Sequence, residues 1–386
     1  MIKNIIAIVK LLIIVILRQV LKLFWIFPLN KNRIVFSSFE GKQYSCNPKY
    51  LFQYILEHYG NAYDYVWVLN KKIDFSVPVK IVKHLSFSHI FLLLTSKYVI
   101  TNFGLIPFLP KRKCQVFMDT WHGSGAYKSQ TLEKKFSGAY DIALLNNRDY
   151  RAKITSWYVS GCKRFSEVSA ESWNADYDKF LPVGTPRNDI FFSKDPSPIN
   201  EKVFNALNLS SEYSYILYAP TYRGNNFRKH EATDLHLDTT KILAACENKF
   251  GKKFMILFRE HLGYFGEKQN SENVIDVSDY PDMQELMLVS DILITDYSSS
   301  IWDWCFLHKP AFLFTPDIDE YLQTRSFYTP IEDWPFLYAR TNEELCSLIL
   351  SFRDDENEKR IKNHLSLLGS YERGNASEQI TKILGL

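Results

Sequence analysis

The sequence lacks the cysteine pairs that mark a disulfide framework or a zinc site. Its six cysteines show no Cys-x-x-Cys pairing and no metal-ligand spacing; they stand at Cys46, Cys114, Cys162, Cys246, Cys305 and Cys346. This distribution suits a reducing compartment, and we interpret the cysteines as buried or incidental. The chain also has no internal repeats and no low-complexity segments, and its net charge of +3 favours no particular class of partner.

The length of the chain predicts more than one domain. At 386 residues it exceeds the ~250 to 300 residues at which single hydrophobic cores stop growing. Hydrophobic residues at 46% and charged residues at 23% are typical of a globular protein. Proline and polar residues cluster at residues 194–197, which predicts a linker there. The predicted parts are therefore an amino-terminal helix over residues 1–29 and two domains over residues 30–194 and 195–386.

Residues 1–27 are rich in aliphatic side chains but lack a long uncharged run. The central stretch without charge covers only residues 11–17, against the ~20 residues expected of a membrane-spanning helix. No small-residue cleavage site follows, so we predict no signal peptide. On a helix the four cations fall within an arc of about 120°, opposite a broad apolar face; they are Lys3, Lys10, Arg18 and Lys22. This pattern favours an amphipathic helix in the headgroup layer of a membrane, while a tilted membrane anchor and a helix buried on the protein stay open.

Strand and helix patterns alternate along the first predicted domain. Short apolar runs predict strands over residues 33–38, 65–69, 79–82, 98–101 and 115–119, and residues 142–146 and 180–183 are further apolar stretches. Helices are predicted from Pro48 to about Tyr59 and over residues 87–96. Alternation of this kind predicts a parallel sheet with helices on both faces.

A histidine follows the strand predicted over residues 115–119. Open α/β sheets bind ligands at the carboxyl ends of their strands, where His122 stands. Gly123 permits close approach of the backbone to a substrate, and His122 can serve as a general base near neutral pH. The alternative is a core histidine beneath a turn. Residues 184–189, which include Arg187, have turn chemistry and form either a turn between elements or a substrate contact.

A second alternating unit occupies the carboxyl-terminal half. Strands are predicted over residues 215–218, 254–258, 274–277, 292–294 and 311–314, and helices over residues 281–289, 341–351 and 354–362. Three of these strands end in polar residues that could contact an anion; they are Thr221 with Arg223, Arg259 with His261, and Ser298 with Ser299. Since the carboxyl ends of parallel strands meet at one edge of a sheet, these residues predict a single anion site.

The serine-rich turn of residues 296–300 is the most suggestive part of that site. It breaks an apolar strand and precedes a predicted helix, so Ser298 and Ser299 would offer hydroxyls and unpaired backbone N–H groups to a phosphate. The alternative is a helix start that is capped by Asp296 or Ser298 and binds nothing. Asp296 could hold the turn or bind substrate hydroxyls, and both roles stay open.

Taken together, these stretches resemble the CDP-glycerol glycerophosphotransferase family, whose members build teichoic acids and related capsule polymers. The matching segments occur in the family's order and cover nearly all of the chain after residue 33; they are residues 36–41, 47–48, 121–123, 183–189, 217–223, 259–261, 290–300 and 373–377. The resemblance implies a glycosyltransferase-B type of fold, in which two Rossmann-like domains face each other across a cleft and the second holds most of the nucleotide donor. It also implies transfer of an alditol phosphate from a CDP-alditol to a hydroxyl acceptor, with release of CMP.

Three positions depart from the family's usual pattern. Residues 124–128 read Ser-Gly-Ala-Tyr-Lys where the family usually has Thr-Pro-Leu-Lys, which bears on the choice of acceptor. Leu262 stands where a proline is usual after the histidine. Arg373 replaces the aspartate of a usual Asp-Gly pair, which bears on donor contacts.

The resemblance and the residue types together predict roles in phosphoryl transfer, which depends on positioning and on stabilisation of charge. His122 would take the proton of the acceptor hydroxyl. Arg223 and His261 would neutralise the diphosphate, and His261 is also a candidate to protonate the CMP leaving group. The remaining expected substrate contacts are Gly123, Arg187, Thr221, Arg259, Asp296, Ser298 and Ser299. No carboxylate pair with clear metal spacing lies beside these motifs, although Asp317 and Asp319 are close in sequence, so we expect no metal and no other cofactor.

The expected partners also follow from the resemblance. They are a CDP-glycerol or CDP-ribitol donor, a polyprenyl-diphosphate-linked saccharide or polymer as acceptor, and the cytoplasmic membrane surface; no nucleic acid is expected. The expected location is peripheral, at the cytoplasmic face of a bacterial plasma membrane. Two other functions stay open: a glycosyltransferase of the same fold that uses a nucleotide sugar for capsule or cell-wall glycan, and a membrane-bound binding protein without catalysis.

Overall fold

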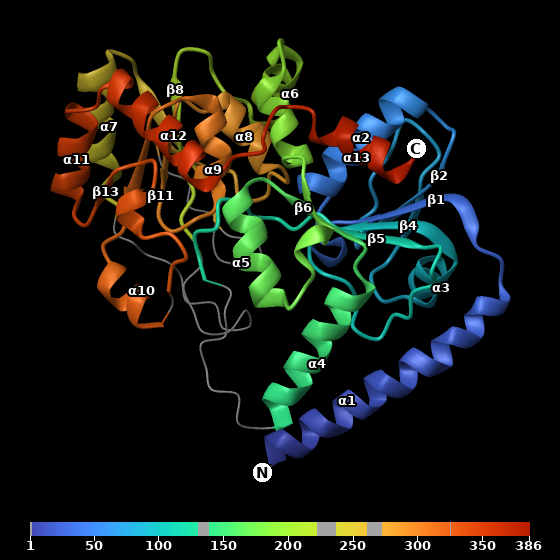
Figure 1. Cartoon of the computed structure of the whole chain (residues 1–386). Coiled ribbons are helices and arrows are strands. Elements are labelled where there is room, and N and C mark those ends of the chain that lie inside the picture. The colour runs from blue at the N-terminus through green and yellow to red at the C-terminus, as the bar shows by residue number, and fades with distance from the viewer. Residues whose placement is uncertain (1, 130–138, 222–236, 261–271, 325) are drawn as a thin grey trace. The chain divides into compact units, whose positions relative to one another are not determined.

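The computed structural model of the chain describes residues 2–129, 139–221, 237–260, 272–324 and 326–386. These residues form two compact units. Unit 1 comprises Met1–His122, Gln130–Asp189 and Tyr371–Leu386, and unit 2 comprises Gly123–Ser129 and Ile190–Ser370. Each unit contains one parallel sheet with helices packed on it (Figure 1). The expected α/β class with two parallel-sheet domains is therefore confirmed.

Unit 1 is built on a seven-stranded sheet in the order β3-β2-β1-β4-β5-β6-β7, in which all neighbouring strands are parallel. The strands are β1 Asn30–Ser37, β2 Asp64–Val68, β3 Lys80–Val82, β4 Ser96–Thr101, β5 Val116–Asp119, β6 Trp157–Ser160 and β7 Phe180–Pro182. The helices are α1 Ile2–Val20, α2 Cys46–Tyr59, α3 Phe87–Thr95, α4 Ala139–Ile154, α5 Lys163–Trp173 and α13 Ala376–Leu384, with 3-10 turns η1 Leu21–Ile26, η2 Phe39–Gly41, η3 Tyr177–Lys179 and η4 Pro186–Phe192.

Side chains of β1 alternate between the two faces of this sheet. Ile34 and Phe36 pack on one face in a cluster that includes Ile380 of α13. Val35 packs on the opposite face in a cluster that includes Leu93 of α3. Since successive side chains of a strand point to opposite faces, this continuous apolar run fits a strand that is covered on both sides.

One apolar stretch of unit 1 is helical. Residues 142–146 lie in α4, and the strand between β5 and β7 is β6, which the sequence patterns did not indicate. A run of five residues is too short to distinguish a strand from a helix by periodicity. The side chain of Ile142 is 62% exposed, so this stretch does not have the burial of a central strand.

Unit 2 contains a six-stranded parallel sheet in the order β10-β9-β8-β11-β12-β13. The strands are β8 Ser214–Tyr218, β9 Phe254–Phe258, β10 Val274–Asp276, β11 Ile292–Thr295, β12 Ala311–Phe314 and β13 Tyr338–Ala339. The helices are α6 Ser197–Leu207, α7 Thr239–Phe250, α8 Met283–Val289, α9 Ser300–Trp304, α10 Ile318–Thr324, α11 Asn342–Leu350 and α12 Asp354–Leu368, with 3-10 turns η5 Cys305–Leu307 and η6 Ile331–Asp333.

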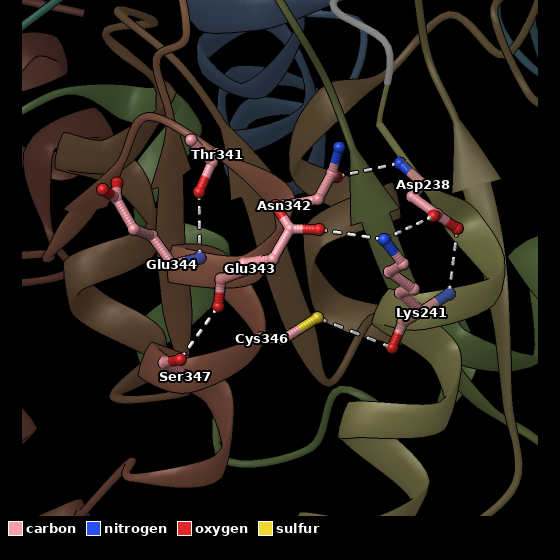
Figure 2. A network of polar contacts seen from close by, with 8 residues as sticks. All are labelled: Asp238, Lys241, Thr341, Asn342, Glu343, Glu344, Cys346 and Ser347. Carbon is pink, nitrogen blue, oxygen red and sulfur yellow. Dashed lines mark hydrogen bonds and ion pairs between the residues drawn. The ribbon is translucent and has the colours of Figure 1, made fainter.

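A polar seam joins α7 and α11 at the surface of unit 2 (Figure 2). Lys241 Nζ lies 2.9 Å from Glu343 Oε1, and Asn342 Oδ1 accepts the backbone N–H of Asp238 at 2.9 Å. These charged groups are exposed, so water and salt screen their attraction. The two helices are held mainly by the apolar cluster beneath the seam, to which Ile242 of α7 contributes.

Both sheets change direction once in their order of strands. The change falls between β1 and β4 in unit 1 and between β8 and β11 in unit 2. Open α/β sheets bind ligands at this point, outside the carboxyl ends of the strands. The ends of these four strands are therefore where each unit is built to hold a ligand.

The amino-terminal helix packs on unit 1, where α1 runs along α4 (Figure 1). Arg18 is 7% exposed; its Nε donates to the carbonyl of Pro107 at 2.8 Å, and its guanidinium lies 3.5 Å from the ring centre of Tyr150. Arg18 therefore does not belong to an exposed basic face. The exposed side chains of α1 are largely apolar; the apolar ones are Ile5, Ile6, Ile8, Val9, Leu12, Ile13, Val15, Ile16 and Val20. Within the described ranges, a helix of the length and apolar character needed to cross a membrane is not found.

Two segments pack in a different unit from the one expected. Residues 371–386 pack in unit 1 and residues 123–129 in unit 2, and the unit boundary nearest the predicted linker falls between Asp189 and Ile190. Linker composition locates a break in the chain. It carries no information on which core a later helix joins.

Candidate functional site

The carboxyl ends of β1, β4 and β5 lie in register in unit 1. Ser37 pairs with Thr101, and Thr101 pairs with Asp119. The residues that follow these three strands therefore meet at one edge of the sheet. His122 is among them, as the sequence predicts.

A backbone carbonyl holds the ring of His122. Its Nδ1 lies 2.7 Å from the carbonyl oxygen of Asn102, and because a carbonyl only accepts, Nδ1 carries the proton. The basic nitrogen of the neutral ring is then Nε2. The ring centre lies 5.4 Å from that of Phe103 and 5.5 Å from that of Phe39. A half-buried imidazole with this tautomer is able to take a proton at Nε2.

Two asparagines, to which the sequence patterns assigned no role, position His122. Asn102 Oδ1 accepts the N–H of Phe39 at 2.8 Å, and its Nδ2 donates to Ser38 Oγ at 3.2 Å, which joins the ends of β1 and β4. Asn47 Nδ2 donates to the carbonyls of both residues that precede His122, each at 3.0 Å. An asparagine after a strand is an ordinary turn residue, so its type alone could not identify this role.

Strained backbone surrounds the histidine. Trp121, Phe39 and Glu40 have φ values of +51°, +46° and +56°. Such conformations cost non-glycine residues on the order of 1–3 kcal/mol each, and they persist only where the surrounding structure enforces them. Their concentration beside His122 is typical of a ligand site.

Residues 184–189 form a structural junction with Glu372. The hydroxyl and the N–H of Thr185 donate to the Glu372 carboxylate at 2.8 and 3.0 Å. Gly184 has φ +82°, and a Cβ there would lie 2.8 Å from Glu372 Oε2. Arg187 is 2% exposed. These contacts favour the interpretation of the segment as a turn between elements.

Gly123 begins a segment that is fastened to unit 2. The N–H of Ser129 donates to the carbonyl of Ser326, and the N–H of Tyr328 donates to the carbonyl of Tyr127, both at 2.8 Å. The chain therefore leads directly from the histidine turn of unit 1 into unit 2.

In unit 2, Asp296 joins the ends of the two strands at the change of strand order. Its Oδ1 and Oδ2 accept the N–H of Thr221 at 2.9 and 3.0 Å. Asp296 is 0% exposed and Thr221 is 7% exposed. Of the two roles considered for Asp296, this geometry favours holding the turn.

The serine turn leads into a very short helix. α9 has five residues, so its dipole is smaller than that of a long helix. Ser298 Oγ accepts the N–H of Ser300 at 3.2 Å, as a capping residue does. The proton of this hydroxyl remains available to another oxygen, because a hydroxyl both donates and accepts. Ser298 and Ser299 are half-buried.

Arg259 and Glu260 follow β9. Arg259 Nη1 donates to the carbonyl of Tyr280 at 2.7 Å, and burial lowers the pKa of its guanidinium to about 10, so it remains a cation at neutral pH. Burial, with a smaller contribution from Asp276, raises the pKa of Glu260 to about 7. The sequence patterns gave Glu260 no role of its own, although it lies between two expected site residues.

Arg223 and His261 lie outside the described residues, so the predicted anion site is described only through its other members. In the described ranges, no three His, Cys, Asp or Glu side chains are grouped so that they could hold a metal ion. Asp317 accepts a hydrogen bond from the Tyr297 hydroxyl at 3.0 Å, and Asp319 pairs with an arginine at 3.0 Å.

Comparison with known proteins decides the family. Residues 19–385 match the profile of the CDP-Glycerol:Poly(glycerophosphate) glycerophosphotransferase family. The chain belongs to this family. The suspected family and the expected enzyme class, a transferase of alditol phosphate, are thereby confirmed.

Relatives of this glycerophosphotransferase family act in teichoic acid synthesis. The chain is 28% identical over 377 residues to the teichoic acid poly(glycerol phosphate) polymerase of Bacillus spizizenii, covering 95% of each chain. It is 27% identical to the teichoic acid ribitol-phosphate polymerase TarK of Staphylococcus aureus, covering 83% of this chain and 64% of that protein. A solved structure of the wall teichoic acid polymerase TagF, a histidine-to-asparagine variant with CDPG, has a TM-score of 0.81 at 25% identity, covering 100% of this chain and 98% of that one.

Proposed function

We propose that this glycerophosphotransferase transfers glycerol phosphate, or another alditol phosphate, from a CDP-alditol to a hydroxyl of a membrane-linked acceptor and releases CMP. The polymer would be a teichoic acid or a related capsule polymer. The single observation that carries the proposal is His122, whose Nδ1 proton is directed to the Asn102 carbonyl at 2.7 Å and whose Nε2 is therefore the basic nitrogen. The relatives that polymerise glycerol phosphate and ribitol phosphate support the choice of donor.

The reaction exchanges one P–O bond for another. The acceptor oxygen bonds to the phosphorus that carries the alditol, the bond from that phosphorus to the CMP oxygen breaks, and the acceptor proton passes to His122 Nε2. The Nδ1–H bond to Asn102 holds the ring and stabilises the imidazolium that forms. Phosphoryl transfer needs little more than this positioning and the neutralisation of charge.

Residues of unit 2 would hold the donor. We assign the phosphate oxygens to the hydroxyls of Thr221, Ser298 and Ser299, and neutralisation of the diphosphate to Arg223 and His261, with His261 also a candidate to protonate the departing CMP. The further contacts proposed from the sequence are supporting ones: the backbone of Gly123, the buried cations Arg187 and Arg259, and Asp296, which holds the turn.

Replacement of the proposed base tests the reaction. His122→Ala should lower the rate of CMP release from CDP-glycerol by about 100-fold or more, which is the usual contribution of general base catalysis. The matched control is His308→Ala, which removes an exposed histidine bonded to Glu358 on the surface of unit 2 and should leave the rate unchanged. Near wild-type turnover in His122→Ala would remove this residue from the mechanism.

A panel of donors separates this function from the other candidates. CDP-glycerol, CDP-ribitol and UDP-sugars are offered in parallel to the wild-type protein with the same acceptor. Release of CMP only from a CDP-alditol agrees with the proposal, whereas turnover of a UDP-sugar would indicate a glycosyltransferase. Failure to turn over any donor would favour a binding protein without catalysis.

We also propose that α1 holds the protein peripherally at the cytoplasmic face of the plasma membrane, where a polyprenyl-diphosphate-linked acceptor would be presented. Apolar side chains of α1 are exposed, and Arg18 is directed into the protein instead of toward lipid. A helix with such a surface binds the boundary between headgroups and acyl chains through its buried apolar area. Membrane partition should therefore depend on these apolar side chains more than on Lys10 and Lys22.

A further inference from the structure

Unit 1 contains a pocket at the change of strand order between β1 and β4. Its volume, counted with the solvent at its mouth, is about 710 Å³. Ser37 and Thr101, which end β1 and β4, line it together with Leu93 of α3. Phe103 lines the pocket and also stacks on His122. His122 is not among the lining residues, and Phe103 joins the pocket to the proposed base within unit 1.

The walls of the pocket are mainly apolar and carry few charges. Of its lining residues only Glu40 and Arg151 bear a permanent charge. His89 accepts the N–H of Leu85 at its Nδ1, 3.0 Å away, and burial lowers its pKa to about 4, so it is neutral. Burial also lowers the pKa of His84. Arg151 is thus the cation of the pocket.

The guanidinium of Arg151 is placed for an external partner. No described residue accepts a hydrogen bond from it or forms an ion pair with it, although Asp119 and Glu40 are near enough to raise its pKa against the lowering caused by burial. Gly104 lies beside it, and a Cβ there would be in ordinary van der Waals contact with Nη1 at 3.7 Å. Arg151 is exposed to solvent, and a cation gains most from a partner that supplies both charge and hydrogen-bond acceptors.

The nearby carboxylates limit the charge of that partner. With Glu40 in the lining and Asp119 near Arg151, a group with several negative charges would be repelled, whereas a single charge would be balanced by Arg151. A phosphodiester carries one negative charge and presents two oxygens to a guanidinium. Glu40 and Leu85, which line the pocket, have strained φ values of +56° and +57°.

From this arrangement we propose that the pocket binds the end of the acceptor, with the phosphodiester next to the terminal alditol on Arg151 and the terminal hydroxyl at His122. This inference rests on the proposed function and deepens it, because it makes a chain that already ends in alditol phosphate the preferred acceptor over a neutral sugar. It assigns Arg151 a role in acceptor specificity. The donor diphosphate, with its higher charge, does not fit this pocket.

Equilibrium binding without donor tests the pocket separately from turnover. Calorimetry measures the affinity of a soluble oligo(glycerol phosphate) for the wild type and for Arg151→Gln, which should weaken binding about tenfold or more. Glu40→Gln removes the nearby negative charge and should strengthen binding severalfold. The control is Lys153→Gln, an exposed cation two residues away on α4, which should change nothing. Circular dichroism shows that each variant is folded.

Kinetics with donor provide the second readout. Arg151→Gln should raise KM for the oligomer while KM for CDP-glycerol stays the same. Equal affinities for wild type and Arg151→Gln, or weaker binding in Glu40→Gln, would overturn the proposal. An effect confined to the same oligomer carried on prenyl diphosphate in vesicles would also overturn it, because Arg151 would then recognise the lipid. If the wild-type protein binds the oligomer through Arg151 but has no activity, the proposed function is refuted, whereas the assignment of the pocket is retained.

Discussion

Asp119, at the end of β5, is a buried carboxyl group that is bonded to the turn carrying His122. Its Oδ1 accepts the N–H of Trp121 at 2.9 Å, and burial raises its pKa from 3.8 to about 6 despite this bond and the nearby Arg151. The folded protein therefore keeps the Asp119 proton at pH values where the unfolded chain has released it. Between these two pKa values the unfolded state binds fewer protons, so the free energy of unfolding falls as pH rises.

Asp119→Asn should remove this pH dependence. The difference in unfolding free energy, variant minus wild type, should increase between pH 4 and pH 6 and then level off, with a total rise of up to about 3 kcal/mol at 1.36 kcal/mol for each unit of pKa. Urea unfolding followed by tryptophan fluorescence across this range measures it. The exposed Asp178→Asn serves as the control. Parallel curves for Asp119→Asn and wild type would contradict the assignment of the shift to burial.

At the scale of one element, α1 shows how a sequence pattern can identify a helix and misplace its faces. The spacing of cations predicts an amphipathic helix, yet Arg18 donates to the Pro107 carbonyl at 2.8 Å and faces α4. A guanidinium with a long aliphatic stem can cover apolar surface and bond to buried carbonyls, so its type does not determine exposure. The exposed apolar side chains are then the part of α1 that needs a partner.

Leu12 and Ile16 are suited to test that partner, because they are 56% and 59% exposed and lie one helical turn apart. The double variant Leu12→Asn/Ile16→Asn should reduce partition onto anionic vesicles by about tenfold or more, since each aliphatic side chain contributes about 1.5–3 kcal/mol when fully buried. The control is Leu350→Asn/Leu367→Asn, which changes exposed leucines of α11 and α12. Sedimentation with vesicles measures the bound fraction, and an equal loss in both double variants would exclude a specific role for α1.

At the scale of the whole molecule, local patterns predicted the elements far better than their partners. The strands at residues 254–258 and 311–314 have the predicted bounds, and alternation with helices predicted both parallel sheets. The strand order depends on pairings between distant residues, which periodicity does not encode. The same limit applies to the site: His122 was predicted from its type and position, whereas Asn102 acquires its role only because β4 lies beside β5.

The carboxyl-terminal helix offers a way to measure this limit, because local patterns do not encode which core a helix joins. Only the structure assigns the apolar face of the last helix, α13, to unit 1, where Ile380 and Leu384 are 0% and 7% exposed. Truncation of buried Leu or Ile to Ala costs about 2–5 kcal/mol at each site, which is a large part of the 5–15 kcal/mol that stabilises a domain. Ile380→Ala/Leu384→Ala should therefore destabilise unit 1 and leave unit 2 unaffected.

Hydrogen exchange resolved along the chain distinguishes the two units. In Ile380→Ala/Leu384→Ala the amides of β1 and β4 should exchange faster, while those of β8 and β11 keep their protection, because only the first pair belongs to the core that α13 covers. Ile383→Ala on the same helix is the control, since Ile383 is 41% exposed and its loss leaves little cavity. Faster exchange in β8 and β11 would instead place the helix in the second domain, where the linker composition alone assigned it.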